Sequence, residues 1–221
     1  MKAVILLSGG MDSAVCCAIA QSEGFSLYAL HVRYHQRTSE KELRCAHALA
    51  THYHVHDFKE LSINFLQEIG GSGLIDSSIE LPVTEKDAHA IPPSYVPFRN
   101  SILLSYATAW AEVISAEAIF YGANSIDFSG YPDCRPRYFK AFQALIDAGT
   151  KDDTRIRLRT PLATMSKAEI VTRGVTLQVP FQLTWSCYID PDMACGVCDS
   201  CRLRLKGFKT AGVTDPIVYR S

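Results

Sequence analysis

The 221-residue chain lacks a long uninterrupted hydrophobic stretch. The apolar run at residues 3–7 ends at once in Ser8-Gly9-Gly10, whereas a secretory signal needs a longer apolar core and a cleavage site of small residues. A membrane-spanning helix needs roughly 18 consecutive uncharged apolar residues, and the sequence contains no such stretch. We therefore expect a cytoplasmic protein that does not enter a membrane.

The sequence also lacks an excess of either charge. It has 22 Lys and Arg against 23 Asp and Glu, which gives a formal net charge of −1. Such a balance provides no general attraction to nucleic acid or to acidic membranes, and no long basic run supplies a local one. We therefore expect small-molecule substrates and no nucleic-acid partner.

The hydrophobic segments alternate in a way that predicts an α/β fold with a doubly wound, mostly parallel sheet. Expected strands lie at residues 2–7, 27–32, 55–61, 118–121 and 155–158, and expected helices at 14–22, 40–53, 101–115, 135–148 and 165–174. Ser166 and Glu169 have the spacing of a capping box at the start of the last helix. Residues 70–98, rich in Gly, Ser and Pro, are expected to be irregular.

The first expected loop, residues 8–13, has the features of an anion site. Unpaired amides and the dipole of the following helix favour negative charge there, and two glycines let the backbone approach a ligand closely. The loop lacks the Gly-Lys-Ser/Thr ending of a Walker loop and the G-x-G-x-x-G pattern of dinucleotide sites. A carboxylate at Asp12 is explained if Mg²⁺ bridges it to phosphates. The predicted nucleotide-binding residues are Leu7, Ser8, Gly9, Gly10, Met11, Asp12, Ser13, Ala14, Val15, Cys16 and Cys17.

Four of the eight cysteines gather in one short segment, as Cys187, Cys195, Cys198 and Cys201. A reducing cytoplasm argues against a disulfide framework, while Cys-x-x-Cys turns hold two thiolates at the spacing that one tetrahedral Zn²⁺ requires. Four thiolates fill the zinc shell, so we predict one structural zinc per chain. An iron–sulfur cluster, which also takes four cysteines, is the main alternative.

The hexapeptide at residues 8–13, Ser-Gly-Gly-Met-Asp-Ser, resembles the PP-motif of the ATP pyrophosphatases. Those enzymes adenylate an oxygen and then displace AMP with nitrogen or sulfur. The resemblance implies ATP with Mg²⁺ as a substrate, and it favours AMP and pyrophosphate over ADP and phosphate as products. It implies a PP-loop nucleotide-binding and catalytic domain at residues 1–180, with the C-terminal zinc-binding module at 181–221.

From Lys2 to about Phe208, the chain resembles the 7-cyano-7-deazaguanine synthases of queuosine biosynthesis. The motifs that carry this resemblance lie at residues 95–100, 122–124, 129–136, 160–162, 166–170, 185–188 and 195–201. Two positions depart from the family. His35 stands where a glycine is expected and Phe98 where many members have glycine, so we expect altered loop shapes near the substrate.

The resemblance implies a ligase that makes 7-cyano-7-deazaguanine from 7-carboxy-7-deazaguanine, ATP and ammonia, through an adenylated carboxylate and an amide. The implied catalytic residues are Ser8, Asp12, Ser13, Arg99 and Lys167, and the implied substrate-binding residues are Phe98, Arg99, Tyr131, Asp133 and Arg135. Arg99 and Lys167 would stabilise the departing pyrophosphate, Tyr131 would stack on the base, and Asp133 would accept its N–H groups.

Simpler explanations stay open for these residues. Arg99 is also consistent with a helix cap, Lys167 with a solvated helix lysine, and Asp133 with an ordinary turn residue. A homodimer is expected from the resemblance and from the apolar C-terminal stretch. The alternative function is that of a PP-loop enzyme which modifies tRNA directly, or of a zinc-containing nucleic-acid-binding module. Tight, strongly salt-dependent RNA binding would favour it.

Overall fold

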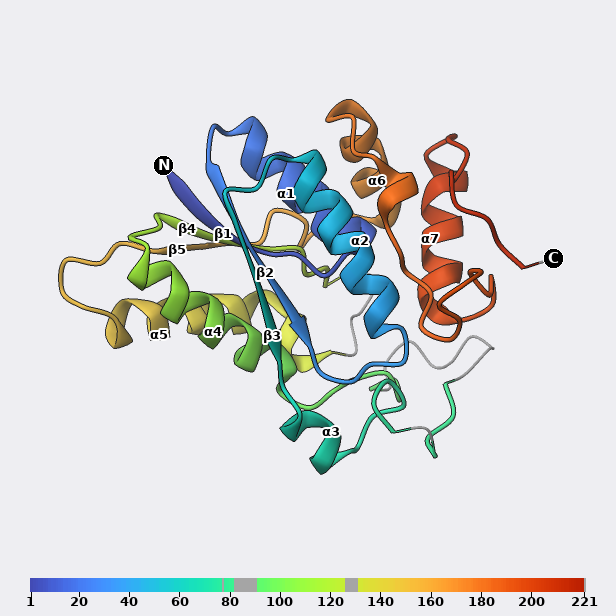
Figure 1. Ribbon diagram of the computed structural model, residues 1–221, viewed down its shortest axis with the longest axis horizontal. Helices are drawn as coiled ribbons and strands as arrows, with labels where there is room; N and C mark the ends of the chain where they lie inside the picture. The colour runs from blue at the N-terminus through green and yellow to red at the C-terminus, as the bar shows by residue number, and fades with distance from the viewer. Residues whose placement is uncertain (77, 82–90, 126–130, 221) are drawn as a thin grey trace.

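The centre of the protein is a five-stranded sheet with the strand order β3-β2-β1-β4-β5 (Figure 1). The structure is a computed structural model that describes residues 1–76, 78–81, 91–125 and 131–220. The strands are β1 (Lys2–Leu6), β2 (Ser26–Arg33), β3 (Asp57–Ser62), β4 (Ala118–Tyr121) and β5 (Arg157–Arg159). Each neighbouring pair is parallel, which confirms the predicted sheet.

Helices cover both faces of the sheet because the buried strand residues alternate between two hydrophobic clusters. Ala3, Ile5 and Leu7 pack in one cluster with α1 (Met11–Ser22), α2 (Ser39–His52) and α6 (Lys167–Thr176). Val4 and Leu6 pack in the other cluster with α4 (Arg99–Val113) and α5 (Pro136–Gly149). Figure 1 shows these two helical layers on opposite sides of the strands.

The remaining elements are short or lie at the C-terminal side. They are α3 (Phe65–Ile69), the two 3₁₀ turns η1 (Pro132–Cys134) and η2 (Phe181–Leu183), and α7 (Asp199–Thr210). Helix α7 packs beside α6, as Figure 1 shows. The segment after η2 also reaches the first loop, where the Trp185 N–H donates to the Gly9 carbonyl at 2.9 Å. The C-terminal part thus contributes to the same end of the sheet as the loop after β1.

Several boundaries differ from the sequence prediction. Helix α1 begins at Met11 and not at Ala14, so Met11, Asp12 and Ser13 form its first turn. Helix α4 begins at Arg99 and not at Ser101, and α3 was not predicted. The described residues between 70 and 98 contain no helix or strand, as expected. The capping box is confirmed, since Ser166 and Glu169 bond reciprocally at the start of α6.

In the part of the chain that the structure describes, we find no helix with the length and apolar character required to cross a membrane.

Candidate active site and metal centre

A cavity of about 230 Å³ opens at the carboxyl ends of β1 and β4. In the sheet, β1 lies between β2 and β4. The chain passes from β1 to β2 on one side, whereas β4 and β5 are added on the other side, so the order of the strands reverses at β1. Open α/β sheets bind ligands at such points. The loops that follow both strands contribute to the cavity wall, through Leu7, Ser8, Gly122 and Asn124.

The loop after β1 is shaped by Gly9, whose φ of +87° lies in the left-handed region. A Cβ atom there would lie 2.3 Å from the Glu42 carbonyl oxygen, so only glycine lets the loop pack against the first turn of α2. The Ser8 hydroxyl accepts from the Gly10 N–H at 3.2 Å and donates to the Ser13 hydroxyl at 3.1 Å. The two hydroxyls are therefore held together at the N-terminus of α1, where an anion is favoured.

Of the eleven predicted nucleotide-binding residues, Gly9 shapes the loop without lining the cavity, and the other ten divide into two groups. Leu7, Ser8, Gly10, Met11, Asp12 and Ser13 line the cavity. Ala14, Val15, Cys16 and Cys17 are buried in the hydrophobic core under α1 and are absent from the cavity wall. Burial raises the pKa of Cys17 to about 12, which makes this thiol unreactive. Their contribution to nucleotide binding stays a prediction.

Lys167 and Asp12 form an ion pair inside the cavity. The Lys167 ammonium group donates to both carboxylate oxygens of Asp12, at 3.0 and 2.8 Å. The side chains are only 9% and 20% exposed, so the pair is poorly screened by water. The two residues are 155 positions apart in the chain, and the fold brings them together at the loop of residues 8–13, which we call the phosphate loop after its predicted role.

Lys167 is held in place by Gly207 of α7. A Cβ atom at Gly207 would lie 2.4 Å from the Lys167 Cγ atom. We expect Gly207→Ala to lower the free energy of unfolding by about 1–3 kcal/mol, the usual cost of overpacking, and to reduce turnover by displacing the ammonium group from Asp12. Denaturant unfolding and steady-state kinetics measure the two effects. Gly149→Ala, with nothing within 4 Å of the new Cβ, is the matched control. A Gly207→Ala variant as active as this control would refute the role of the contact.

Arg99 also lines the cavity, where it lies among tyrosines. Its guanidinium donates to the Tyr34 hydroxyl at 2.8 Å, and Tyr121, Tyr131 and Tyr188 line the same space. The Nε atom is buried and has no hydrogen-bond partner. No carboxylate among the described residues lies within 4.0 Å of Arg99, so its positive charge is available to an anionic ligand.

Asn100, the next residue, connects α4 to the segment that carries Tyr131 and Asp133. Its N–H donates to an Asp133 carboxylate oxygen at 3.1 Å, and its side-chain oxygen accepts from the Tyr121 hydroxyl at 2.6 Å. Tyr131 is buried on the cavity wall and bonds to the Ser94 hydroxyl at 2.7 Å. These contacts fix Tyr131 and Arg99 relative to each other.

Three predicted substrate-binding residues do not line the cavity. Asp133 is 4% exposed and binds the N-terminus of α4, although its Oδ1 atom has no hydrogen-bond partner. Arg135 precedes the first residue of α5 and is partly exposed. Phe98 is 65% exposed. Base recognition by these three residues stays a prediction.

The two departures from the family pattern share a backbone conformation. His35 has a φ of 62° and Phe98 a φ of 58°, both in the left-handed region that glycine adopts without cost. The loops therefore keep the shape that glycine would provide, and the non-glycine residues carry backbone strain instead. The expected change of loop shape near the substrate stays a prediction.

Several cavity residues were not predicted from the sequence. Tyr34, Glu42, Tyr121, Tyr188 and Arg204 all line the wall. They come from five different parts of the chain, and no local pattern marks them. Tyr188 belongs to the motif at residues 185–188, from which no role for the tyrosine was predicted, and Glu42 has the ordinary place of an acidic residue in the first turn of a helix.

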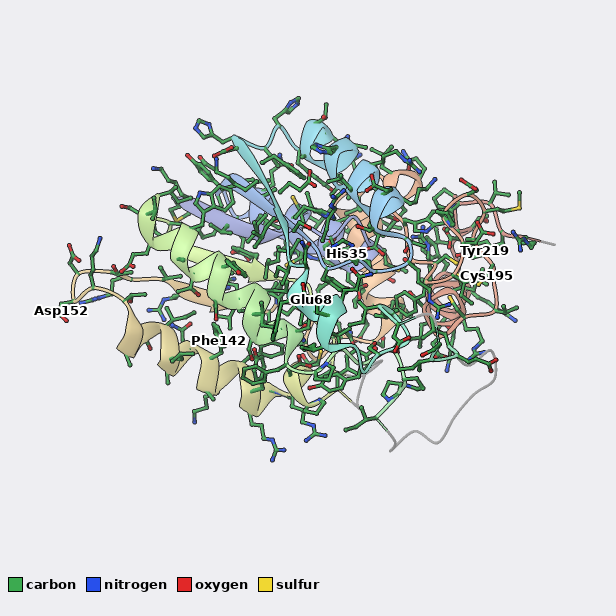
Figure 2. All side chains as sticks on the ribbon, turned by 60° about the horizontal axis from the view of Figure 1, so that its bottom comes forward. His35, Glu68, Phe142, Asp152, Cys195 and Tyr219 are labelled. Carbon is green, nitrogen blue, oxygen red and sulfur yellow. The ribbon has the colours of Figure 1, made fainter. Side chains whose placement is uncertain are left out.

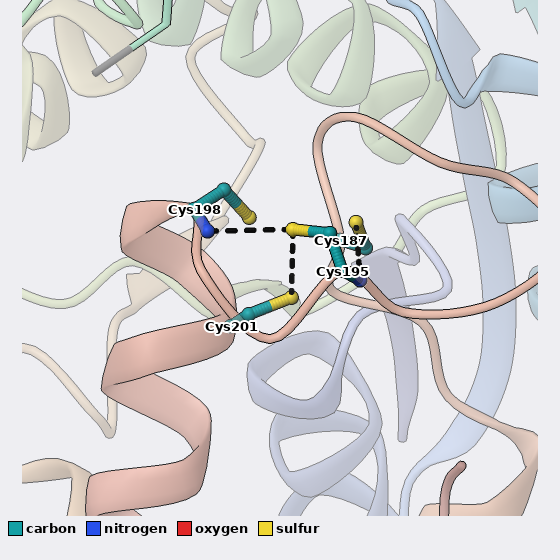
Figure 3. Close-up of side chains that lie close together, drawn as sticks. All are labelled: Cys187, Cys195, Cys198 and Cys201. Atoms are coloured by element: carbon teal, nitrogen blue, oxygen red, sulfur yellow. Dashed lines mark hydrogen bonds between the residues drawn. The ribbon is translucent and has the colours of Figure 1, made fainter. Parts of the chain in front are cut away.

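The four clustered cysteines form one compact group. The ligand atoms of Cys187, Cys195, Cys198 and Cys201 all lie within 4.8 Å of one another, and Figure 3 shows them gathered between the loop and the start of α7. The Cys195 and Cys201 sulfur atoms are 3.9 Å apart. Two thiolates on a tetrahedral Zn²⁺, each bound at about 2.3 Å, have nearly this separation. The group could therefore hold a single metal ion.

The surroundings of Cys187 favour a thiolate at this one position of the group. The Cys187 sulfur accepts from the N–H groups of Ile189, Asp190 and Cys195, each at 3.4 Å. The neighbouring thiols of Cys198 and Cys201, together with these amides, lower the pKa of Cys187 well below its usual range. Deprotonated sulfur is the form that binds metal.

Arg204 anchors this region. Its guanidinium, 1% exposed, donates to both carboxylate oxygens of Asp215 at 2.8 and 2.9 Å, and to the Thr184 hydroxyl at 2.7 Å. Tyr219 also donates to Asp215 and lies beside Cys195, as Figure 2 shows. A buried ion pair thus joins α7 to the chain before and after the cysteines.

The parallel sheet, the phosphate loop after its first strand and the cavity at the strand-order reversal define an α/β enzyme of the PP-loop class. Among solved structures, a 4-thiouridine synthetase in complex with RNA and with bound ATP aligns with a TM-score of 0.50 and 23% identity. The alignment covers 80% of this chain and 41% of that chain, so this chain spans less than half of that structure. This likeness concerns the fold alone.

Sequence comparison identifies the family. The profile of the family described as Queuosine biosynthesis protein QueC matches residues 2–212, and this chain belongs to that family. The 7-cyano-7-deazaguanine synthase of Chlorobium chlorochromatii (strain CaD3) is 52% identical over 221 residues, which cover 100% of this chain and 97% of the relative. The 7-cyano-7-deazaguanine synthase of Methanospirillum hungatei JF-1 is 47% identical over 220 residues and is covered completely.

Proposed function

We propose that this enzyme converts 7-carboxy-7-deazaguanine, ATP and ammonia to 7-cyano-7-deazaguanine. The observation that carries the proposal is the cavity itself, which is lined both by the loop at residues 8–13 and by an arginine that has no carboxylate partner among the described residues. Such a space suits a nucleotide on one wall and an anionic substrate on the other. The name that the relatives share supplies the product.

Activation of the carboxylate is the chemical problem that ATP solves. A carboxylate is a poor electrophile and its oxygen is a poor leaving group, whereas an acyl-adenylate has a good leaving group. Ser8 and Ser13, with the amides at the start of α1, would bind the phosphates. Arg99 would neutralise the substrate carboxylate and the charge that develops as pyrophosphate departs. Lys167 would contact the same phosphates.

Asp12 has a second role in this proposal. Its carboxylate pairs with Lys167, and hard oxygen ligands are those that Mg²⁺ prefers. When ATP binds with Mg²⁺, Asp12 would hold the metal, and Lys167 would be free to bind a phosphate oxygen. The ion supplies charge neutralisation for the triphosphate. The close Lys167–Asp12 pair keeps both side chains at the phosphate loop until then.

The nitrile requires the cycle to run twice. Ammonia first displaces AMP from the acyl-adenylate to give an amide. A second adenylation of the amide oxygen then allows loss of that oxygen as AMP and formation of the nitrile. The base would stay bound beside Tyr131 while nucleotides exchange. No histidine lies among the described residues of the cavity wall, and no activated nucleophile is present there, so we assign no covalent enzyme intermediate.

For the cysteine group we propose a structural zinc ion. Sulfur atoms within 4.8 Å of one another fit one ion, whereas an iron–sulfur cluster with one cysteine on each iron needs its sulfurs further apart. Four thiolates leave no position for substrate. The ion would hold the loop against α7, and no chemical step passes through it.

Product analysis tests the proposed reaction. Purified enzyme is incubated with ATP, Mg²⁺, ammonium and 7-carboxy-7-deazaguanine, and the products are identified by mass spectrometry. We expect amide and then nitrile, with AMP and pyrophosphate formed only when the carboxylic acid is present. A folded, metal-loaded enzyme that forms neither amide nor nitrile would refute the assignment.

A further inference from the structure

Glu42 carries a partly buried carboxyl group on the cavity wall that has no role in the reaction steps proposed above. It lies in the first turn of α2, where its carbonyl oxygen contacts Gly9 of the phosphate loop. Its side chain extends into the cavity, toward the charge of Arg99. The carboxyl therefore lines the same cavity as the loop that we assign to the nucleotide phosphates and the arginine that we assign to the substrate carboxylate.

The hydrogen bonds of Glu42 are those of an acceptor. The Thr38 hydroxyl donates to its Oε1 atom at 2.7 Å, and the Gln36 amide donates to its Oε2 atom at 2.9 Å. Both donors are neutral, and no Lys or Arg among the described residues forms an ion pair with this carboxylate. A carboxylate that is held in place by neutral donors keeps its capacity to take up a proton.

Burial raises the pKa of the Glu42 carboxyl above its usual range, while the bonds from Gln36 and Thr38 and the charge of Arg99 oppose that change. The other titratable groups that face it are Tyr34, which follows β2, and Cys45 on α2. Burial raises the pKa of both, so they stay neutral, and among the described residues Arg99 is the charge that acts on the Glu42 carboxyl. A carboxyl with a raised pKa is a better proton acceptor at neutral pH than an ordinary one.

The other groups on the described cavity wall are poorer acceptors. Asp12 is engaged by Lys167. Burial raises the pKa of Tyr131 to about 12 and that of Cys134 to about 11, so both are already protonated at neutral pH. The cations on this wall have no proton to gain. Glu42 remains as the group that can receive a proton inside the cavity.

The proposed reaction needs such a group, because ammonia is present mostly as ammonium at neutral pH and its nitrogen then has no free electron pair. We propose that Glu42 accepts the proton that ammonium loses before its nitrogen attacks the activated carboxyl carbon. The inference rests on the proposed function.

The step balances in atoms and charge. The Glu42 carboxylate takes one proton from ammonium and becomes a carboxylic acid. The freed electron pair of ammonia forms the carbon–nitrogen bond, and the bond from that carbon to the AMP oxygen breaks, its electron pair leaving on AMP. The nitrogen releases a further proton to water as the amide forms, and Glu42 returns its own proton to water before the next round.

The test compares two nitrogen nucleophiles. Hydroxylamine is a weaker base than ammonia and is unprotonated at neutral pH, so it needs no proton acceptor before attack. Wild-type enzyme, Glu42→Gln and the control Glu40→Gln are each given 7-carboxy-7-deazaguanine, ATP and Mg²⁺ with either ammonium or hydroxylamine. Glu40 lies on the same turn with an exposed side chain, so the control matches the change in charge. Pyrophosphate, amide and hydroxamate are measured from pH 6 to pH 9.

We expect Glu42→Gln to lose about 10²-fold or more in amide formation from ammonium near pH 7, the usual contribution of general base catalysis. Hydroxamate formation and carboxylate-dependent pyrophosphate release should fall far less. The residual rate with ammonium should rise about tenfold per pH unit, because free ammonia increases by that factor below its own pKa.

Two results would overturn the proposal: an equal loss with both nucleophiles, which indicates a structural role, or a Glu42→Gln variant that matches Glu40→Gln with ammonium at every pH. If the wild-type enzyme itself released no pyrophosphate in response to the carboxylic acid, the proposed function would fail and this inference with it.

Discussion

Cys198→Ser is expected to release the metal ion and to lower the free energy of unfolding by several kcal/mol. Structural zinc contributes on the order of 10–16 kcal/mol to the folding of small zinc-binding peptides, and one lost thiolate removes a large share of that affinity. Cys198 caps α7 and its N–H donates to the Cys195 sulfur at 3.3 Å, so its loss disturbs both sides of the group. Elemental analysis and denaturant unfolding measure the two effects.

The same substitution should reduce activity, although the cysteines do not touch the substrate in our proposal. Helix α7 carries Gly207, which holds Lys167, and the segment after η2 donates from Trp185 to Gly9 of the phosphate loop. Loosening this region therefore displaces groups at the phosphate loop. Chelation of the metal from wild-type protein should have the same effect.

Cys45→Ala is the control for the metal-site variant. Cys45 packs beside the cysteine group but does not belong to it. We expect the control to keep its metal and to lose little stability. Wild-type protein that contains no metal, or a Cys198→Ser variant as stable as the control, would contradict the structural role.

Arg99→Met is expected to lower turnover by about 10²–10³-fold without lowering stability. The loss of activity follows from removing the charge that stabilises the transition state. Stability should stay the same or rise by about 1 kcal/mol, because the guanidinium is surrounded by tyrosines and pairs with no described carboxylate. Methionine fills similar space without a charge. Steady-state kinetics and thermal unfolding are the measurements.

Arg155→Met is the matched control, because Arg155 is exposed and lies outside the cavity. It should keep both activity and stability. An Arg99→Met variant that is active, or that is inactive only because it unfolds, would contradict the assignment of Arg99 as an anion-binding residue.

The parts of the site that could be predicted from the sequence are those encoded locally. The glycines and serines of residues 8–13 lie between a hydrophobic run and a helix, and the spacing of the four cysteines is a metal-binding pattern on its own. The Ser166–Glu169 capping box is likewise a feature of four consecutive residues, and it is confirmed. In each case, neighbours in the chain carry the chemistry.

The rest of the cavity depends on contacts between distant segments. Tyr34, Tyr121 and Tyr188 surround Arg99, but they come from three different parts of the chain, and a tyrosine near a strand end is common. Lys167 can pair with Asp12 only because α6 lies against the start of α1. The need for a glycine at position 207 arises only because α7 packs on α6, against the side chain of Lys167. Nothing in the local sequence distinguishes Glu42 from Glu40.

For Asp133, the local sequence predicts one role and the structure shows a contact of another kind. Its position in a Gly/Pro-rich loop after a strand predicted a ligand-binding carboxylate. In the structure it accepts from the Asn100 N–H at the start of α4, which the sequence prediction began two residues too late. A correct helix start alone would not have revealed this contact, because Asp133 lies 33 positions from Asn100 in the chain.

The central claim is that ATP activates the substrate by transferring its adenylyl group to the carboxylate oxygen. The most direct test uses 7-carboxy-7-deazaguanine with oxygen-18 in both carboxyl positions, incubated with the wild-type enzyme, ATP, Mg²⁺ and ammonium. The account predicts that each carboxyl oxygen leaves on an AMP molecule, so that each nitrile formed yields two labelled AMP molecules and unlabelled pyrophosphate. Label recovered in inorganic phosphate together with ADP, or nitrile formed with unlabelled AMP, would contradict it.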